Sequence, residues 1–487
     1  MRKEDLQDAF QLLPDDLVME GLEERPDVVQ RNRRRTMTRW ISSMAACLVL
    51  AVGSILFANE IGDRSKSSYP EKDTATNTSM QFDQPGKTAN NEMPTDAVIA
   101  LPSDGINAPG DVPKEGESPV VDFAEEGEMM LADFSMRASA LALSEAAATD
   151  RNLLFCPEGF YNCLAMASAG ADDDFREELV RIMGASSTQD LVDLMALRTG
   201  RGFRTDDSVL RLGTSVWVDD SLGAVREDYI RTIRQWNGEV YHGQMASAEM
   251  RQQILDWVAR ETEGRSTFEP DPRSLLTFLS TVYYADLWEE PFKAEGIVTD
   301  SFVRADGQKV QTSFMTDMVW NSVAWEGEDY FRTVRAFQNG EMFFVLPKEG
   351  TDLTALCENP EVLEDVVFGG DMFQASVRWQ IPRFIMDAET DYTELAIKLG
   401  MSKLITAESS FTSIAEGAVG LAGDLSQHCY LRIDEKGVEA AGSTRMEESA
   451  AHTFVQMTLT RPFLYGILDN QGRIIFVGIC NDPTVTK

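Results

Sequence analysis

Apolar and polar residues alternate in a stretch near the C-terminal end of the chain. From Val438 to Glu447, one set of alternate residues is small or apolar and the other set is mostly polar. A period of two is typical of a half-buried β-strand. Small side chains also suit a strand that has to pass between two existing strands. The pattern predicts a loop that is able to become a sheet strand, although an ordinary strand and loop can show the same alternation by chance.

Helical and strand periodicities recur along the rest of the chain. Apolar residues at helical spacing predict helices in residues 134–147, 226–236, 252–265 and 393–401. Strand-like runs lie in residues 209–220, 275–292, 341–349, 377–384 and 474–483. Residues 152–171 combine a short strand with a helix that starts near a proline and ends at a glycine. Asp172, Asp173 and Asp174 either cap the next helix or form a cation site, and capping is the simpler interpretation.

The composition narrows the classes of function. The chain has 487 residues, enough for one large domain with extensions, and its net charge of -36 opposes binding to nucleic-acid phosphates. The cysteines are dispersed, with no CxxC pair and no metal-ligand spacing. We expect them to be mostly free and buried, with a disulfide as the alternative. They are Cys47, Cys156, Cys163, Cys357, Cys429 and Cys480.

No catalytic motif stands out in the sequence. The three histidines form neither an HExxH motif nor a paired metal set. There is no nucleophile elbow, no phosphate-binding P-loop and no dinucleotide-binding GxGxxG after a strand. His452 and Ser449 are neighbours in a loop rather than members of a catalytic triad. We therefore predict a protein that is not an enzyme and that has no cofactor and no metal.

The N-terminal part of the chain divides into three segments. Residues 1–39 are polar and end in a cluster of arginines, and Trp40–Ala58 is a run of 19 residues without charge. A helix needs about 20 apolar residues to span a bilayer, and the positive-inside rule places residues 1–39 in the cytoplasm. Residues 59–127 are polar and rich in proline and glycine, which predicts a disordered extracytoplasmic linker. A cleaved signal peptide is the alternative to a transmembrane helix at residues 40–58.

Several segments resemble the serpin family of serine protease inhibitors, in the order in which that family carries them. They are Glu435-Lys436-Gly437, Arg461-Pro462-Phe463, the closing strand Ile474–Pro483, Asn152–Ala171 and Leu275–Phe292. The resemblance covers about residues 129–485 and suggests a bacterial-type, membrane-anchored member. It implies an α+β fold for residues 128–487, with a large central mixed β-sheet, two smaller sheets, about eight to nine helices and an exposed reactive loop.

The resemblance also implies which residues belong to the moving part of the molecule. In that family a hinge enters the central sheet at the breach, the point where the sheet first opens. The breach residues here are Trp288, Arg383 and Glu435. We predict an ion pair between Arg383 and Glu435, with two unrelated surface charges as the alternative. The hinge comprises Glu435, Lys436, Gly437, Val438, Glu439, Ala440, Ala441, Gly442, Ser443 and Thr444.

Serpins trap the protease that cuts them, and the resemblance implies this activity here. Counted from Glu435, the reactive bond is Ala451–His452, with Ala450–Ala451 as the alternative. A small residue before the bond suits elastase-like or subtilisin-like serine proteases. The implied partner is a target serine protease in a covalent acyl complex with a monomeric inhibitor. Two other functions stay open, a non-inhibitory binding module and an extracellular hydrolase of unknown type.

Four positions beneath the central sheet depart from the family pattern. Cys156 and Gly159 stand where the family usually has serines, and Ser280 stands where it usually has an asparagine. His428 lies one residue closer to Glu435 than the family histidine that sits under the sheet. The family serines form hydrogen bonds where the sheet opens, so these departures put the opening step in question.

Overall fold

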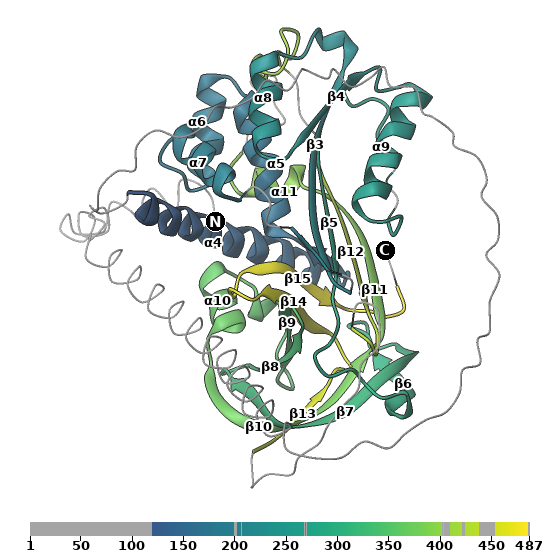
Figure 1. Ribbon diagram of the computed structural model, residues 1–487. Coiled ribbons are helices and arrows are strands. Elements are labelled where there is room, and N and C mark those ends of the chain that lie inside the picture. The colour runs from purple at the N-terminus through teal and green to yellow at the C-terminus, as the bar shows by residue number, and fades with distance from the viewer. Residues whose placement is uncertain are drawn as a thin grey trace, which may run out of the picture. The chain divides into compact units, whose positions relative to one another are not determined.

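The computed structural model describes residues 119–485, apart from residues 199–201, 206, 267, 269, 402, 404–409, 421–423 and 438–452 (Figure 1). No helix within these ranges is long and apolar enough to cross a bilayer. The apolar run Trp40–Ala58 and the predicted segments on either side of it, up to residue 118, lie outside the described residues.

A six-stranded sheet has the strand order β11-β12-β5-β3-β2, and β4 also pairs with β3. Its strands are β11 (Phe384–Asp391), β12 (Asp424–Ile433), β5 (Leu276–Ala285), β3 (Val209–Asp219), β2 (Phe203–Arg204) and β4 (Glu239–Gly243). All ten residues of β5 are buried. Its uninterrupted run of apolar and small residues is typical of a strand that is covered on both faces.

Two contacts in this sheet are parallel, β3 with β4 and β5 with β12, and the others are antiparallel. We refer to the contact between β5 and β12 as the seam. Along the seam Asp424 lies opposite Thr277 and Tyr430 lies opposite Tyr283. A strand that runs antiparallel to both neighbours would fit between two parallel strands.

A nine-stranded sheet has the order β1-β15-β14-β9-β8-β7-β10-β13, with β6 paired to β7. Its strands are β1 (Leu153–Phe155), β15 (Ile474–Cys480), β14 (Phe463–Asp469), β9 (Gly340–Pro347), β8 (Tyr330–Phe337), β7 (Lys309–Glu326), β10 (Asp371–Pro382), β13 (Thr453–Thr458) and β6 (Ile297–Val303). The 18-residue strand β7 pairs with β6, β8 and β10 and so joins the strands expected in two smaller sheets. Strand β10 passes directly into β11 through Arg383, which links this sheet to the six-stranded sheet.

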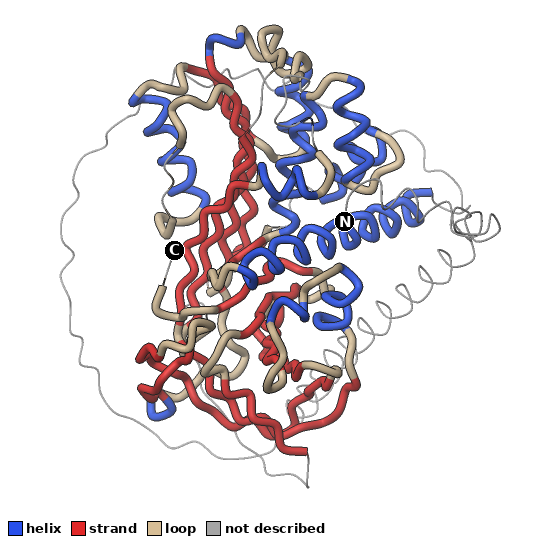
Figure 2. Tube along the Cα trace, turned by 180° about the vertical axis from the view of Figure 1, so that it is seen from behind, coloured by secondary structure: helices blue, strands red, loops and turns tan. Residues whose placement is uncertain are grey.

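The described part of the chain contains eight α-helices. They are α4 (Pro119–Ala148), α5 (Pro157–Gly170), α6 (Asp173–Ile182), α7 (Thr188–Arg198), α8 (Glu227–Gln235), α9 (Ala248–Glu261), α10 (Pro360–Phe368) and α11 (Thr393–Lys398). Figures 1 and 2 show α5 on one side of the six-stranded sheet and α9 on the other. The helices and strands predicted from periodicity are present, and the α+β fold class is confirmed.

The predicted linker ends earlier in the structure than its composition indicates. Helix α4 starts at Pro119 and therefore includes the last residues of the segment 59–127 that composition predicts to be a linker. Gly127 is buried there, and a Cβ on it would lie 2.9 Å from Leu194 Cδ1, so tertiary packing holds this turn of the helix. Asp172 occupies the N-cap position of α6, as predicted, but its carboxylate accepts hydrogen bonds from Thr412 N and Oγ1 and not from the first turn of the helix.

The buried apolar side chains form three clusters. The largest lies between the helices and both sheets, the second lies between the two sheets, and the third lies under α9. The third cluster includes Trp217, Trp257 and Phe268. The five described cysteines are buried and form no disulfide with one another, as predicted from their spacing, and they are Cys156, Cys163, Cys357, Cys429 and Cys480.

Candidate functional site

A tight turn follows the C-terminal end of β12 at the seam. Asp434 N donates to Gly437 O (3.1 Å), and Gly437 N donates to Asp434 O (3.2 Å). The carboxylate of Asp434 accepts a hydrogen bond from Lys436 N (2.9 Å) and pairs with Arg432 (3.0 Å). Gly437 has a φ of +114°, which glycine adopts without strain. The chain therefore reverses its direction within four residues.

Gly437 lies between the ends of β5 and β12. It forms one antiparallel bridge with Asp434 and another with Leu287, which follows β5. A Cβ on Gly437 would lie 2.5 Å from Trp288 N and 2.6 Å from Asp286 O, so a larger residue does not fit. Gly437, the last residue of the turn, thus lies where the first residue of a strand between β5 and β12 would lie, antiparallel to both.

The three predicted breach residues come together around this turn. Trp288 is buried, its Nε1 donates to Asp434 O (2.9 Å), and its ring stacks on Phe337 with centroids 4.3 Å apart. The guanidinium of Arg383 lies 2.5 Å from the carboxylate of Glu435, so the predicted ion pair is present. Both of its side chains are about one-third exposed, and such a pair contributes at most about 1 kcal/mol. The ion pair therefore lies at the predicted breach but adds little to the stability of the fold.

A glutamine that was not predicted as a site residue connects the two sides of the seam from beneath. Gln427 is buried on β12, and its Oε1 accepts from Cys156 N (3.0 Å) and from Cys429 Sγ (3.0 Å). Its Nε2 donates to Cys156 O (3.1 Å) and to Ser280 Oγ (3.2 Å), which belongs to β5. All four hydrogen-bonding positions of the amide are used. One side chain thus joins β12, β5 and the start of α5.

The atypical residues Gly159 and Ser280 make room for this amide. A Cβ on Gly159 would lie 2.2 Å from Gln427 Nε2 and 3.1 Å from Ser280 Oγ. The small residues Gly159 and Ser280 therefore leave the space that the Gln427 amide occupies. The sequence indicates only that Gln427 is buried, because it shares its parity on β12 with the buried residues Leu425 and Leu431, and it does not indicate what the amide contacts.

His428 faces the opposite side of the sheet. Its ring packs edge-on against Phe268, which follows α9, with centroids 4.5 Å apart. The residue one position earlier, Gln427, is the one that faces α5 beneath the sheet. His428 is thus no counterpart of the family histidine, because adjacent residues of a strand point to opposite faces.

Two thiols lie close to the Gln427 amide. Cys429 donates to Gln427 Oε1, and Cys163 on α5 interacts with Ser280. Burial raises the pKa of the Cys429 thiol and raises that of Cys163 to about 12. Both groups are therefore uncharged near neutral pH and act as small apolar residues. Within the described residues, no group of three or more His, Cys, Asp or Glu side chains could hold a metal ion.

The rest of the predicted hinge and the reactive bond lie outside the described residues. These positions are Val438, Glu439, Ala440, Ala441, Gly442, Ser443, Thr444, Ala450, Ala451 and His452. The chain is described again from Thr453, where β13 pairs in parallel with β10 of the nine-stranded sheet. The 15 residues 438–452 therefore connect the seam to the edge of the other sheet.

Comparisons with known proteins agree with this geometry. The family model for Serpin (serine protease inhibitor) matches residues 130–483. Serpin-Z1A from Triticum aestivum is 23% identical over 383 residues, which are 72% of this chain and 95% of that protein. Human thyroxine-binding globulin with its ligand has a TM-score of 0.65 at 20% identity, over 74% of this chain and 100% of that one. Arabidopsis AtSerpin1 in its native stressed conformation has a TM-score of 0.63 at 20% identity, over 76% and 100%.

The chain belongs to the serpin family, and its fold is the serpin fold. Relatives in this family are mostly protease inhibitors, but some of them do not inhibit proteases. The resemblance noted in the sequence is therefore correct at the level of family and fold.

Proposed function

We propose that this protein inhibits serine proteases by inserting its cleaved reactive loop into the seam. The observation that carries the proposal is the position of Gly437, which already pairs with the ends of both β5 and β12. These strands are parallel, so a chain that turns back after β12 runs antiparallel to both. Insertion would replace one direct contact with two antiparallel ladders, and the added backbone hydrogen bonds favour the inserted state.

The steps follow from the chemistry of acyl transfer. A protease attacks the reactive bond, and its serine forms an ester with the residue before that bond while the downstream segment leaves. The N-terminal part of the loop then enters the seam and carries the acylated protease with it. Residues 438–451, which remain upstream of the proposed cut, span roughly 45 Å when extended at about 3.3 Å per residue, whereas the neighbouring strand β12 has ten residues. The loop is therefore long enough to fill the seam.

The sequence of the loop supports a target with a shallow specificity pocket. The proposed reactive bond is Ala451–His452, with Ala450–Ala451 as the neighbouring choice. Alanine before the bond fits elastase-like and subtilisin-like proteases. Val438, Ala440, Gly442 and Thr444 would face the interior of the sheet after insertion, and none of them carries a charge.

The location of the inhibitor follows from the N-terminal segments. We propose that residues 40–58 anchor a monomer in the membrane, with residues 1–39 in the cytoplasm and the serpin domain outside. Residues 59–127 would connect the two as a linker. Extraction of the full-length protein by detergent, but not by carbonate, is the expected result, and release by carbonate would contradict the anchor.

The likeness to thyroxine-binding globulin favours a second candidate, a serpin-fold module that binds a ligand and does not inhibit. Such a module needs no loop insertion. It would therefore be cut in the loop without forming a covalent complex and without gaining heat resistance. We propose that the protein is not an enzyme in either case.

The direct test mixes the full-length protein with pancreatic elastase and with subtilisin. The expected product is a complex that survives boiling in SDS, with a new C-terminus at Ala451 or Ala450 by mass spectrometry. Val438→Arg is the informative variant, because a charge would have to enter the sheet first. This variant should be cleaved and released without a complex. Cleavage of the wild type with no complex and no gain in melting temperature would contradict inhibition.

A further inference from the structure

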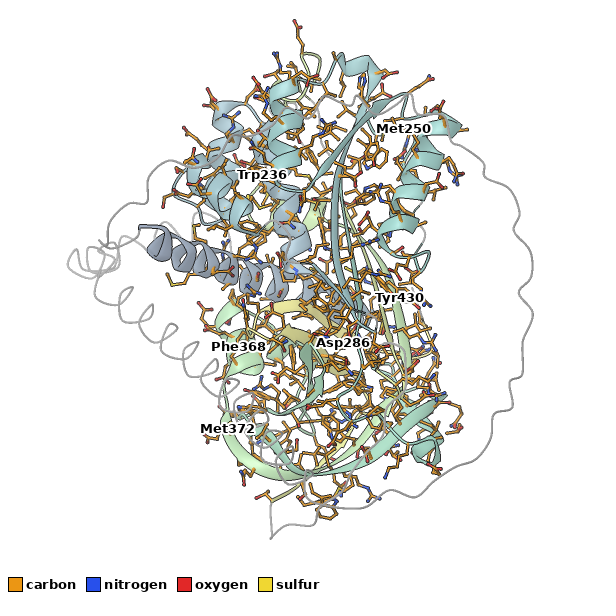
Figure 3. All side chains as sticks on the ribbon, viewed as in Figure 1. Trp236, Met250, Asp286, Phe368, Met372 and Tyr430 are labelled. Carbon is orange, nitrogen blue, oxygen red and sulfur yellow. The ribbon has the colours of Figure 1, made fainter. Side chains whose placement is uncertain are left out.

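Asp286 is a buried carboxylate at the breach that the proposed mechanism leaves without a role. It is fully buried, in the interior where the six-stranded sheet approaches the nine-stranded sheet (Figure 3). Its Oδ1 accepts from Ser208 Oγ (2.7 Å), Leu287 N (2.8 Å) and Asn339 Nδ2 (3.3 Å). Its Oδ2 accepts from Tyr284 OH (2.9 Å) and Asn339 N (2.8 Å). All five donors are neutral groups.

The Asp286 carboxylate forms its hydrogen bonds where the backbone pairing between β3 and β5 ends. The last pair of that ladder is Val209 with Ala285, one residue before Asp286. Ser208 directly precedes β3, and Asn339 lies in the turn between β8 and β9. Hydrogen bonds to one side chain therefore hold the end of β5 to β3 and to the β8–β9 hairpin.

The same residue borders the position of Gly437. Asp286 O would lie 2.6 Å from a Cβ on Gly437, and Leu287 forms the bridge to Gly437. Because Asp286 Oδ1 binds the N–H of Leu287, the side chain fixes the peptide unit beside which the first loop residue pairs. Movement of Asp286 would move this first backbone pair.

We propose that Asp286 is a positioning residue for loop insertion, which holds the receiving end of β5 so that the loop forms its first pair in a fixed register. The inference rests on the proposed function, because only an inserting loop uses that register. The chemistry requires a carboxylate, since each of its oxygens accepts one backbone N–H, from Leu287 or from Asn339. The amide of an asparagine would place a donor against one of these N–H groups.

The variant Asp286→Asn in the full-length protein tests the proposal. We expect a several-fold rise in the number of inhibitor molecules consumed for each protease trapped. The rate of the first attack on the loop should not change, because the protease meets the loop before insertion begins. Asp219→Asn is the matched control, since Asp219 is buried at the other end of β3 and accepts from Ser221 N (2.9 Å) and Met245 N (2.8 Å).

A loss of thermal stability in both variants, with excess consumption only in Asp286→Asn, supports the positioning role. Equal consumption by the two variants overturns the positioning role, because it shows that Asp286 only stabilises the fold. If the wild type traps no protease, the proposed function fails by itself. The positioning role is then tested by the rise in melting temperature when the loop is cut. A smaller rise in Asp286→Asn than in Asp219→Asn supports the role, whereas an equal rise, or no rise, overturns it.

A variant that removes one bond covers the case in which Asp286→Asn does not fold. Ser208→Ala deletes one of the five hydrogen bonds and leaves both backbone N–H groups bound to Asp286. We expect the consumption of this variant to exceed that of the wild type and of Asp219→Asn. Consumption at the wild-type level in a folded Ser208→Ala protein, with reduced thermal stability, counts against the role.

Discussion

Gly437 meets two demands that other residues cannot meet together. Its φ of +114° is unfavourable for residues with a Cβ, and that Cβ would also collide with Trp288 N at 2.5 Å. We therefore expect Gly437→Ala to lower the free energy of unfolding of the uncut protein by about 1–3 kcal/mol. Urea denaturation followed by tryptophan fluorescence measures the change.

Gly472 is a control for the cost of a positive φ without a steric clash. Its φ is also positive, +73°, but no atom lies within 4 Å of where its Cβ would stand. Gly472→Ala should therefore cost only the backbone strain, about 1–2 kcal/mol. A cost at Gly437 no greater than that at Gly472 would mean that the contact with Trp288 relaxes freely.

The Gln427 amide and Gly159 should behave as a coupled pair. Gly159→Ala introduces a methyl group 2.2 Å from Gln427 Nε2, so the amide has to leave Cys156 and Ser280. Gln427→Ala removes the obstacle and the hydrogen bonds together. The double variant should be more stable than the sum of the two single losses predicts, by about 1–3 kcal/mol in a double-mutant cycle. Additive losses would contradict a direct contact.

Some contacts of individual residues could be predicted from the sequence and others could not. The pairing of Arg383 with Glu435 and the burial of Trp288 could be predicted, because the chain carries the motifs around them. Gln427 could not, because its role depends on the absence of a side chain at Gly159, more than 250 residues away in the sequence. The absent Cβ of Gly159 on α5 and the amide of Gln427 on β12 become neighbours only in the folded protein.

At the scale of elements, α9 and the segment after it tie together the two sides of the seam. On one side, Trp257 of α9 packs edge-on against Trp217 of β3 at 6.3 Å and donates to Glu239 of β4 (2.9 Å). On the other side, Ser266 Oγ donates to Asp387 of β11 (2.6 Å), and Phe268 packs on His428 of β12. Opening the seam by one strand separates these attachments by about 4.8 Å. The segment should therefore resist opening.

Ser266→Ala tests this resistance. The variant loses one hydrogen bond to a carboxylate, so the uncut protein should lose about 1–2 kcal/mol of stability. A synthetic peptide with the sequence of residues 438–450 should bind into the seam faster than in the wild type, as followed by native gel electrophoresis. Ser301→Ala, which removes an exposed hydrogen bond to Gln311 on the other sheet, is the control. Equal rates in the two variants would show that the segment does not limit opening.

Most elements could be predicted from periodicity, but the strand order could not. The runs that form β3, β5, β9 and β15 are continuous in the sequence, so their burial patterns are visible there. The joining of two expected smaller sheets depends on β7, whose end pairs with β8 over residues 324–326. The parallel seam depends on a pairing across nearly 150 residues, which the periodicity of the two strands does not show.

At the scale of the whole molecule, a cut at the proposed reactive bond would divide the chain very unequally. A cut at Ala451–His452 leaves residues 452–487 as a separate piece that contains β13, β14 and β15. Strands β14 and β15 lie inside the nine-stranded sheet, between β9 and β1, and nearly all their residues are buried. We expect the cut protein to run as one particle in gel filtration and as two bands in SDS. Loss of the small piece under native conditions would contradict this strand order.

The interior position of β14 and β15 has a consequence for assembly. A protein cut in this way becomes a heterodimer whose smaller subunit was made as part of its partner. That subunit contributes Phe463, Tyr465 and Phe476 to a shared interior, so its dissociation requires global unfolding. The cut protein would therefore be a permanent two-chain complex, because neither chain has a complete core of its own.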